Sequence, residues 1–156
     1  MIALLTLLLA TTFPSTDKTS WMRPESFHLI IGMPRGEAVK ALEENGWKLK
    51  PGDDPNHAVV DYQDDKALTL QFNRDRLHSI RFELFAILPE AHTAFAEEKA
   101  FLRRTLGEPK KKIKSKSILI YDRQLPNVMV VLNADPKSET AQRGLGILVV
   151  RYFDPR

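Results

Sequence analysis

The chain contains no cysteine, and this absence excludes disulfide bonds, thiolate metal sites and a cysteine nucleophile. It also excludes a lipidated cysteine in this sequence. Neither disulfides nor metals are needed for stability, because a chain of 156 residues can bury roughly two-thirds of its extended surface. Hydrophobic residues make up 43% and charged residues 28% of the chain, proportions typical of a folded domain and not of a disordered one.

Recognisable catalytic and metal-binding motifs are missing as well. No G-x-S-x-G turn presents a serine nucleophile, and the four histidines are widely spaced, without H-x-H or H-E-x-x-H. One histidine has acidic neighbours in sequence, at Asp53, Asp54, His57 and Asp61, but the prolines and glycine of PGDDPNH favour a solvated turn. We therefore expect no catalytic residues, no cofactor and no metal site, and we interpret the protein as non-enzymatic.

The longest apolar run lies at the N-terminus and is too short to cross a bilayer, which needs about 20 apolar residues. Residues 2–10 (IALLTLLLA) suit the apolar core of a secretory signal peptide, with Ala10 and Thr12 small enough for cleavage positions. No lysine or arginine precedes the run. We expect a signal peptide over residues 1–15 and a periplasmic or secreted protein; the alternative is a buried N-terminal strand or helix.

Two helices are predicted from apolar spacing. Residues 16–26 are polar, with Pro24, and are interpreted as a linker or N-terminal arm. Ala38 and Leu42 share one face of a short amphipathic helix over residues 36–45. A longer helix over residues 89–106 has an apolar stripe at Ala91, Ala94, Phe95, Phe101, Leu102 and Leu106. Glu97 and Glu98 are adjacent on it, hence about 100° apart, and do not face each other as an acid–base pair would.

Six segments have the composition and alternation of strands: residues 57–63, 67–72, 76–85, 117–122, 127–132 and 146–153. In the third, Leu77, Ser79, Arg81 and Glu83 alternate with His78, Ile80, Phe82 and Leu84. Asn73, Arg74 and Asp75 are expected to form a tight hairpin before it, and Gly144 and Gly146 a bend at the start of the sixth strand.

A helix followed by three strands occurs twice along the chain. The offset between the helix-ending glycines Gly46 and Gly107 also separates Ala67 from Val128, where two predicted strands begin. We therefore expect a single α+β domain over residues 27–156, made of half-repeats 27–88 and 89–156. These would form one antiparallel sheet of about six strands, with both helices packed on one face.

Two short phrases carry a resemblance to known proteins. IIGMPRGEAVKALEENGW resembles the opening of domains related to the SmpA/OmlA outer-membrane assembly lipoproteins, and it is similar to the half-repeats of the β-lactamase inhibitor protein. FNRDRLHSI is similar to the hairpin phrase of the same proteins, with Asp75 in place of glycine, and Pro34 stands in place of a helix-capping threonine. The resemblance covers most of residues 27–153, and it implies an exported domain that acts by binding other proteins.

The most unbalanced charge lies in KKKIKSK. The candidate cluster contains Arg103, Arg104, Lys110, Lys111, Lys112, Lys114 and Lys116. Lysines on an edge strand block aggregation, so a solvated sheet edge is the simpler interpretation. The alternative is an electrostatic site for anionic lipid headgroups or another polyanion. Nucleic acid is disfavoured because no aromatic residues alternate with the lysines. The preferred hypothesis is a protein-binding or envelope-assembly module that uses the open sheet face or its edge to bind another envelope or secreted protein.

Overall fold

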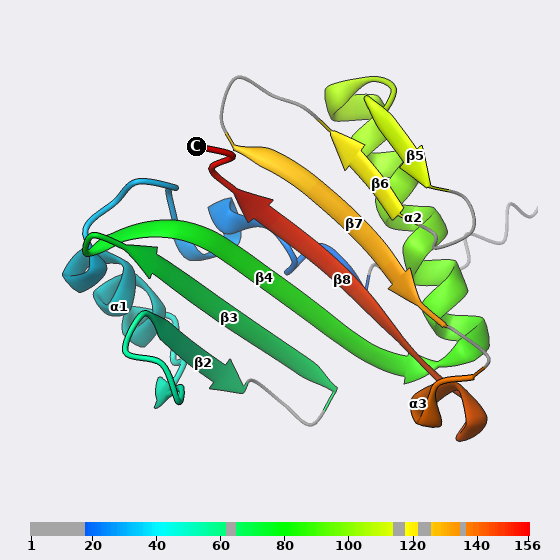
Figure 1. Ribbon diagram of the computed structural model, residues 1–156, viewed down its shortest axis with the longest axis horizontal. Helices are drawn as coiled ribbons and strands as arrows, with labels where there is room; N and C mark the ends of the chain where they lie inside the picture. The colour runs from blue at the N-terminus through cyan, green and yellow to red at the C-terminus, as the bar shows by residue number, and fades with distance from the viewer. Residues whose placement is uncertain (1–17, 62–64, 114–117, 122–125, 135–136) are drawn as a thin grey trace, which may run out of the picture.

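A computed structural model describes residues 18–61, 65–113, 118–121, 126–134 and 137–156 (Figure 1). The expected signal peptide, residues 1–15, lies outside these ranges. The helical elements are η1 (Pro24–Phe27), α1 (Arg35–Glu44), α2 (Leu88–Leu106) and α3 (Glu139–Gln142). The strands are β1 (Lys50–Pro51), β2 (His57–Asp61), β3 (Lys66–Asn73), β4 (Arg76–Ile87), β5 (Lys111–Ile113), β6 (Ile118–Tyr121), β7 (Asn127–Asn133) and β8 (Leu145–Phe153).

The described strands form one antiparallel sheet in the order β1-β2-β3-β4-β8-β7-β6-β5. The predicted α+β class and antiparallel sheet are therefore confirmed. Six of these strands have four or more residues and match the six predicted segments, whereas β1 and β5 are short strands at the two edges. β4 and β8 pair at the centre, which joins the neighbours β2 and β3 to β6 and β7 in one sheet (Figure 1).

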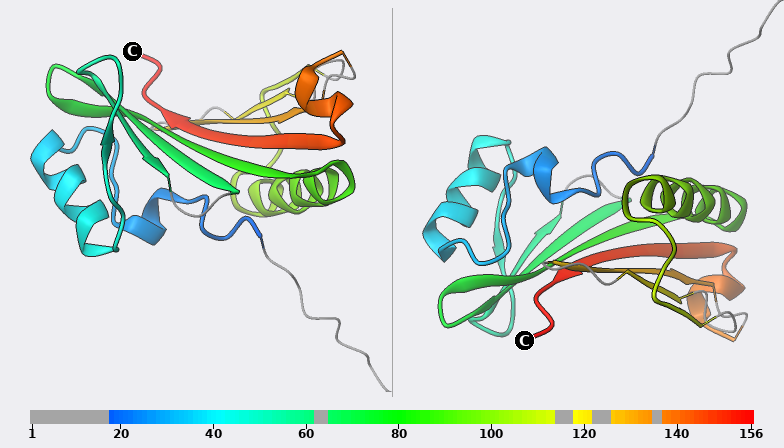
Figure 2. Two further views of the ribbon diagram at one scale, coloured as in Figure 1. Left: turned by 90° about the horizontal axis from the view of Figure 1, so that it is seen from below. Right: turned by 90° about the horizontal axis from the view of Figure 1, so that it is seen from above.

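The core lies between the sheet and the helices η1, α1 and α2, which all cover the same face (Figure 2). Leu68, Phe82 and Val150 occupy one row across β3, β4 and β8, and none of them is exposed. Such side chains alternate along each strand with residues of the opposite face, as a pleated sheet requires. The sheet therefore has one face buried under helices and one face that they leave open.

A β-bulge in β4 makes its side-chain alternation differ from the one predicted for the third segment. Simple alternation predicts Leu77 on the face of Ser79 and Arg81, yet Leu77 is buried in the core. The register shifts between Gln71 and Phe72: Gln71 pairs with Ser79, whereas Phe72 pairs with Leu77, so His78 is the extra residue. A bulge of this kind reverses the side-chain phase along a strand, and here it lets Leu77 join Phe72 in the core.

The predicted hairpin between β3 and β4 is present. Arg74 and Asp75 both have positive φ, as a two-residue type I′ turn requires. Arg35, at the start of α1, donates from Nε to Asp75 Oδ1 over 2.9 Å, which fastens the helix to the hairpin. Pro34 is the N-cap residue of α1 and offers no side-chain cap, as its chemistry implies.

Residues before η1 pack into the core, so the described part of the 16–26 segment is an arm and not an exposed linker. Met22 is fully buried, and the Trp21 ring meets the Phe82 ring edge-on with 5.6 Å between centres. Phe27 makes a similar contact with Trp47, at 4.8 Å. Large aromatic side chains supply much buried area, so this arm is part of the folded domain.

The arm is tied to α2 by a buried ion pair. Glu98 is fully buried on α2, and its Oε2 lies 3.2 Å from Arg23 Nη2. The Arg23 guanidinium also lies 3.6 Å from the centre of the Phe101 ring and donates to the Thr19 carbonyl. The predicted apolar stripe of this helix therefore omitted Glu98, which occupies its buried face between Phe95 and Leu102.

Of the two glycines expected to form a bend, only Gly144 has that role. Gly144 has a φ of +76° immediately before β8. Gly146 lies within β8, where an added Cβ would be 2.8 Å from the Ala91 Cβ on α2. Gly146 thus allows α2 to approach the centre of the sheet closely.

Candidate functional site

The face of the sheet opposite η1, α1 and α2 is the candidate functional surface, here named the open face. Figure 2 shows it free of these helices, with the short α3 beside its end at the start of β8. On the two central strands it is formed by Arg81, Glu83, Phe85, Ile87, Leu145, Ile147, Val149 and Arg151. These residues belong to the strands with the most complete pairing, so the backbone beneath the surface is rigid.

One end of the open face is apolar. Ile87 pairs with Leu145, and Phe85 pairs with Ile147 across β4 and β8. Ile87 is 52% exposed, Phe85 37% and Leu145 36%, values unusual for such large apolar side chains on a paired strand. Exposed apolar residues that are adjacent, unlike isolated ones, mark surfaces that contact other molecules. This end therefore has the chemistry of a protein contact.

The centre of the open face carries two arginines opposite each other. Arg81 on β4 pairs in register with Arg151 on β8. Arg81 donates from Nη2 to Glu83 Oε1 over 2.6 Å. Arg151 instead donates to neutral groups, from Nε to Ser79 Oγ over 2.8 Å and from Nη2 to Gln71 Oε1 over 3.3 Å. Among the described residues, the nearby carboxylate of Glu83 thus contacts Arg81 and not Arg151.

The surroundings of Arg151 disfavour its charge. Partial burial lowers the pKa of its guanidinium, and the positive charge of Arg81 lowers it further. Arginine keeps its proton at neutral pH in spite of this, so the effect is a free-energy cost and not a loss of charge. Among the described residues, Arg151 has no carboxylate partner. An anion bound beside Arg151 would therefore offset this free-energy cost.

The two edges of the sheet are poor places for another strand to add. β1 has two residues, one of them Pro51, which has no N–H to donate. β5 has three residues, including the exposed Lys111 and Lys112. Short strands, proline and lysine are the features that protect sheet edges from further pairing. The structure thus makes the open face a better candidate surface than either edge.

The predicted basic cluster divides between the end of α2 and the edge strand β5. Arg103 and Arg104 lie in the last turn of α2, and Lys111 and Lys112 lie on β5. Lys110 directly precedes β5 and is exposed, while Lys114 and Lys116 lie outside the described residues.

An acidic residue offsets part of this cluster. Glu108 lies 2.5 Å from Arg103 and 3.0 Å from Lys112, counted between the charged atoms of each pair. The hydrogen bond from Lys112 is the main cause that lowers the pKa of the Glu108 carboxyl, with Arg103 adding to it. Both observations suit the solvated edge that the sequence favoured, because exposed ion pairs of this kind are common and weak.

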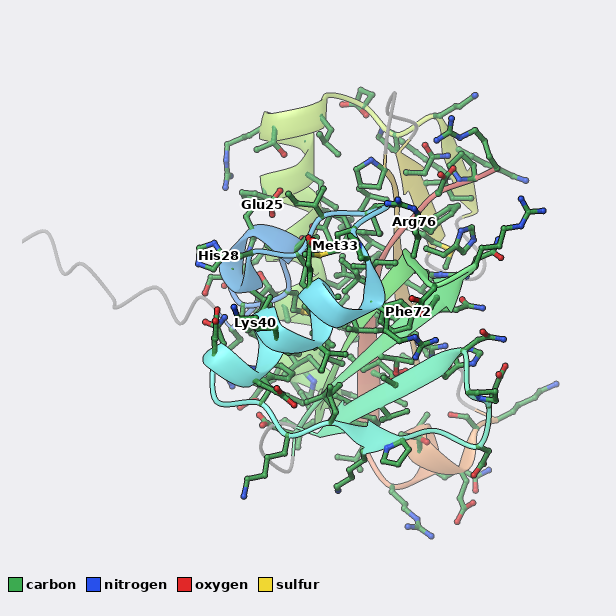
Figure 3. All side chains as sticks on the ribbon, turned by 90° about the vertical axis from the view of Figure 1, so that its left-hand side faces the viewer. Glu25, His28, Met33, Lys40, Phe72 and Arg76 are labelled. Atoms are coloured by element: carbon green, nitrogen blue, oxygen red, sulfur yellow. The ribbon has the colours of Figure 1, made fainter. Side chains whose placement is uncertain are left out.

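The four histidines lie at separate places in the fold. His28 is the C-cap residue after η1, His57 begins β2, His78 is the bulged residue of β4, and His92 lies on α2. In Figure 3, Glu25 on η1 and the C-cap residue His28 are labelled at the same element, and Arg76 is labelled at the start of β4. Within the described residues, no group of three or more histidine, aspartate or glutamate side chains could hold a metal ion.

The acidic segment before His57 forms a local turn. Asp54 accepts a hydrogen bond from the Asn56 N–H over 2.8 Å, and Asp54 Oδ2 lies 3.1 Å from His57 Nδ1. The Asn56 N–H is the main cause that lowers the pKa of Asp54, with His57 contributing. An aspartate that bonds the backbone two residues ahead is typical of an Asx turn, which agrees with the predicted solvated turn.

No helix among the described residues is long and apolar enough to cross a membrane. Comparison with protein-family models, curated proteins and solved structures found no match for this chain. The resemblance to assembly lipoproteins and to the β-lactamase inhibitor protein therefore stays a prediction.

The sequence predicts an open sheet face but does not identify the residues that form it. One pattern could have located them: LFAI at the end of β4 and ILVV within β8 are apolar at successive positions and not only at alternate ones. Apolar residues in both phases of a strand indicate that both of its faces are covered, either by other parts of the fold or by a bound partner. The arginine pair could not be found in this way, because it depends on the register between β4 and β8.

Proposed function

We propose that this protein is an exported, non-enzymatic module that binds another envelope or secreted protein through its open face. The observation that supports this most is the adjacent exposure of Phe85, Ile87 and Leu145 on an otherwise well-packed sheet. Burial of these side chains by a partner would remove apolar area from water at about 25 cal/mol per Å². Export rests on the apolar run of residues 2–10.

The face is favoured over the edges as the binding surface. Strand addition needs a row of free backbone groups, and the short edges β1 and β5 provide few of them. Side-chain contacts on the open face need no such row. The central strands β4 and β8 hold their side chains in fixed positions, which lowers the entropy lost on binding.

Binding of anionic lipid or another polyanion through the basic cluster is the second candidate. It is supported by the position of exposed Arg104, Lys110 and Lys111 at one corner of the molecule, where α2 ends and β5 begins. Glu108 reduces the net charge there by pairing with Arg103 and Lys112. The remaining charge gives a modest, salt-dependent attraction to an anionic surface.

We also propose that the domain consists of two half-repeats, residues 27–88 and 89–156. In each half a helix precedes strands that run to the centre of the sheet: α1 precedes β2–β4, and α2 precedes β6–β8. The halves would then meet where their last strands, β4 and β8, pair.

Site-specific photo-crosslinking tests the preferred function in the producing cell. A photoreactive amino acid replaces Phe85 on the open face or, as a matched control, Lys40 on α1. Lys40 is exposed on the helix-covered side of the sheet, where Figure 3 shows it on α1. We expect a discrete protein adduct from position 85 that is lost when Ile87→Asp is added, and none from position 40. Equal adducts from both positions, or none from position 85, would contradict open-face binding.

Vesicle binding tests the second candidate separately. Wild type and a Lys112→Gln/Lys114→Gln/Lys116→Gln variant are compared on phosphatidylglycerol vesicles at low and at physiological salt. Wild-type binding at low salt that is lost in the variant would support the basic cluster as the site. Equal binding by both proteins would reduce the lysines to a solvated edge.

A further inference from the structure

The charge balance at the centre of the open face is incomplete. Arg81 and Arg151 are opposite each other, and Glu83 is the one carboxylate in contact with either of them among the described residues. The group therefore has a net charge of one positive unit. Like charges directly opposite on neighbouring strands destabilise a sheet, and a half-buried guanidinium with neutral partners adds to that cost.

The orientation of Arg151 leaves part of its hydrogen-bonding capacity for a ligand. Its Nε and Nη2 donate to Ser79 and Gln71, which hold the guanidinium over β4. A guanidinium has five N–H donors in a planar fork. The bonds to Ser79 and Gln71 use two of them. The guanidinium also lies 5.2 Å from the centre of the Phe153 ring, and because it is only partly buried, its other donors are accessible to a ligand. A fork held in place in this way is suited to a carboxylate.

We propose that Arg151, with Arg81 as the neighbouring cation, binds a side-chain carboxylate of the partner protein, and that neighbouring partner residues cover the apolar end of the open face. This inference rests on the proposed function and specifies the chemistry of its partner. A single carboxylate matches the net positive charge of the group. A multiply charged phosphate or lipid headgroup would exceed it and would also meet Glu83, 2.6 Å from Arg81.

A second copy of this chain is a poor occupant of the face. Two open faces packed on each other would each present Arg81, Glu83 and Arg151, a group with a net charge of one positive unit, so the second copy would add positive charge and not balance it. The apolar end would be matched in such a dimer, but the charged centre would be desolvated without a counter-charge. Charge complementarity therefore points to a different protein with an acidic residue.

The spacing along β8 predicts a pattern in the partner. Arg151, Val149 and Ile147 lie on the same face, and residues two apart on a strand are separated by about 7 Å. An extended segment that places an aspartate or glutamate at Arg151 would place its residues two and four positions away over Val149 and Ile147. We therefore expect an acidic residue followed or preceded by apolar residues at alternate positions.

Selection from a phage-displayed library of random peptides tests this pattern. The wild-type chain is the bait, and peptides that also bind an Ile87→Asp/Phe85→Asp variant are removed. We expect the remaining peptides to be enriched in aspartate or glutamate with apolar residues at alternate positions. A synthetic peptide of the consensus and its asparagine or glutamine counterpart are then titrated against wild type, Arg151→Met, Arg81→Met and the control Lys40→Met.

The acidic peptide is expected to bind wild type and Lys40→Met equally and Arg151→Met at least about tenfold more weakly, because a hydrogen-bonded charge pair is lost. The neutral peptide should bind wild type as weakly as the acidic one binds Arg151→Met. Amide NMR spectra verify the fold of each variant. If Arg151→Met does not fold, Arg151→Lys takes its place, since it keeps the charge but lacks the fork.

The other outcomes separate this inference from the function on which it rests. Peptides that depend on Ile87 but show no acidic preference, or that ignore the arginine substitutions, would overturn the inference and leave the protein-binding function standing. Absence of any peptide that depends on the open face would overturn both. Displacement of the acidic peptide by inorganic phosphate or phosphatidylglycerol vesicles at similar affinity would make the group a general anion site. Wild-type dimerisation lost in Ile87→Asp would make a second copy the occupant.

Discussion

Arg81 on β4 and Arg151 on β8 are direct cross-strand neighbours at the centre of the sheet. Most cross-strand pairs on a sheet stabilise it, and an opposed pair of like charges does the reverse. The pair lies between the apolar end of the open face and the β3–β4 hairpin, on the two strands that join both parts of the sheet. The two arginines therefore lie on a rigid part of the backbone, and their local charge is unfavourable for the fold.

The arginine pair predicts a repulsive coupling energy. In a double-mutant cycle of Arg81→Gln and Arg151→Gln, the interaction between the native side chains should destabilise the fold by about 0.2–1 kcal/mol. Because part of the site is solvated, the coupling should shrink as salt increases. Urea unfolding of the four proteins at low and high salt provides the measurement. An attractive coupling would show that the two guanidinium groups share an unidentified anion, and a coupling of zero would show that they lie farther apart than the register implies.

The buried Arg23–Glu98 pair predicts a large loss of stability when one partner is removed. Glu98→Leu leaves the Arg23 cation without its buried carboxylate and should cost about 3–5 kcal/mol. Adding Arg23→Met should restore most of that loss, since no unpaired charge then remains. Thermal and urea unfolding compare these variants with Glu97→Leu, a change at the neighbouring helix position that should stay within about 0.5 kcal/mol of wild type. A small effect of Glu98→Leu alone would mean that the pair is not buried in solution.

Close packing of α2 on β8 predicts that Gly146→Ala is destabilising. The new methyl group would be 2.8 Å from the Ala91 Cβ, and such overpacking costs about 1–3 kcal/mol. Ala91→Gly should recover part of this loss, less about 1 kcal/mol for glycine within a helix. The control is Gly36→Ala in α1. An added Cβ there would have no neighbouring atom within 4 Å outside the adjacent helix backbone, and the helix should gain about 0.5–1 kcal/mol. Equal effects at the two glycines in urea unfolding would contradict the close approach.

Glu108 predicts a pH effect with a defined sign. Its carboxyl pKa is lowered in the folded state, chiefly by the hydrogen bond from Lys112 and then by Arg103. The contribution of this ion pair to stability is therefore complete above the pKa of the unfolded chain and is lost as pH falls through the lower folded-state pKa. NMR titration of the carboxyl carbon should give a pKa below the usual glutamate range.

Lys112→Gln should move the pKa of Glu108 upward. The pKa of Asp154 serves as the internal reference, because it is lowered chiefly by Arg156 near the C-terminus and should not change. A Glu108 titration that is the same in wild type and Lys112→Gln would show that this ion pair does not persist in solution.

Local patterns in the sequence determined the class of fold, the helices α1 and α2, the β3–β4 hairpin and the six longer strands. Each depends on residues close together in the chain: the spacing of Ala38 and Leu42 on α1, or the positive-φ turn at Arg74 and Asp75. The basic character of β5 was equally local, and its position at a sheet edge agrees with the simpler interpretation of the lysines.

Contacts between distant residues were decided only by the tertiary structure. The bulge at His78 places Leu77 in the core. Arg23 pairs with Glu98, 75 residues away in sequence. Gly146 allows the close approach of α2 and does not form a bend. The register of β4 with β8 likewise placed Arg81 opposite Arg151 and Ile87 opposite Leu145. A one-residue change of register would exchange the two faces of a strand, so no composition or periodicity within a single strand specifies which side chains meet across the sheet.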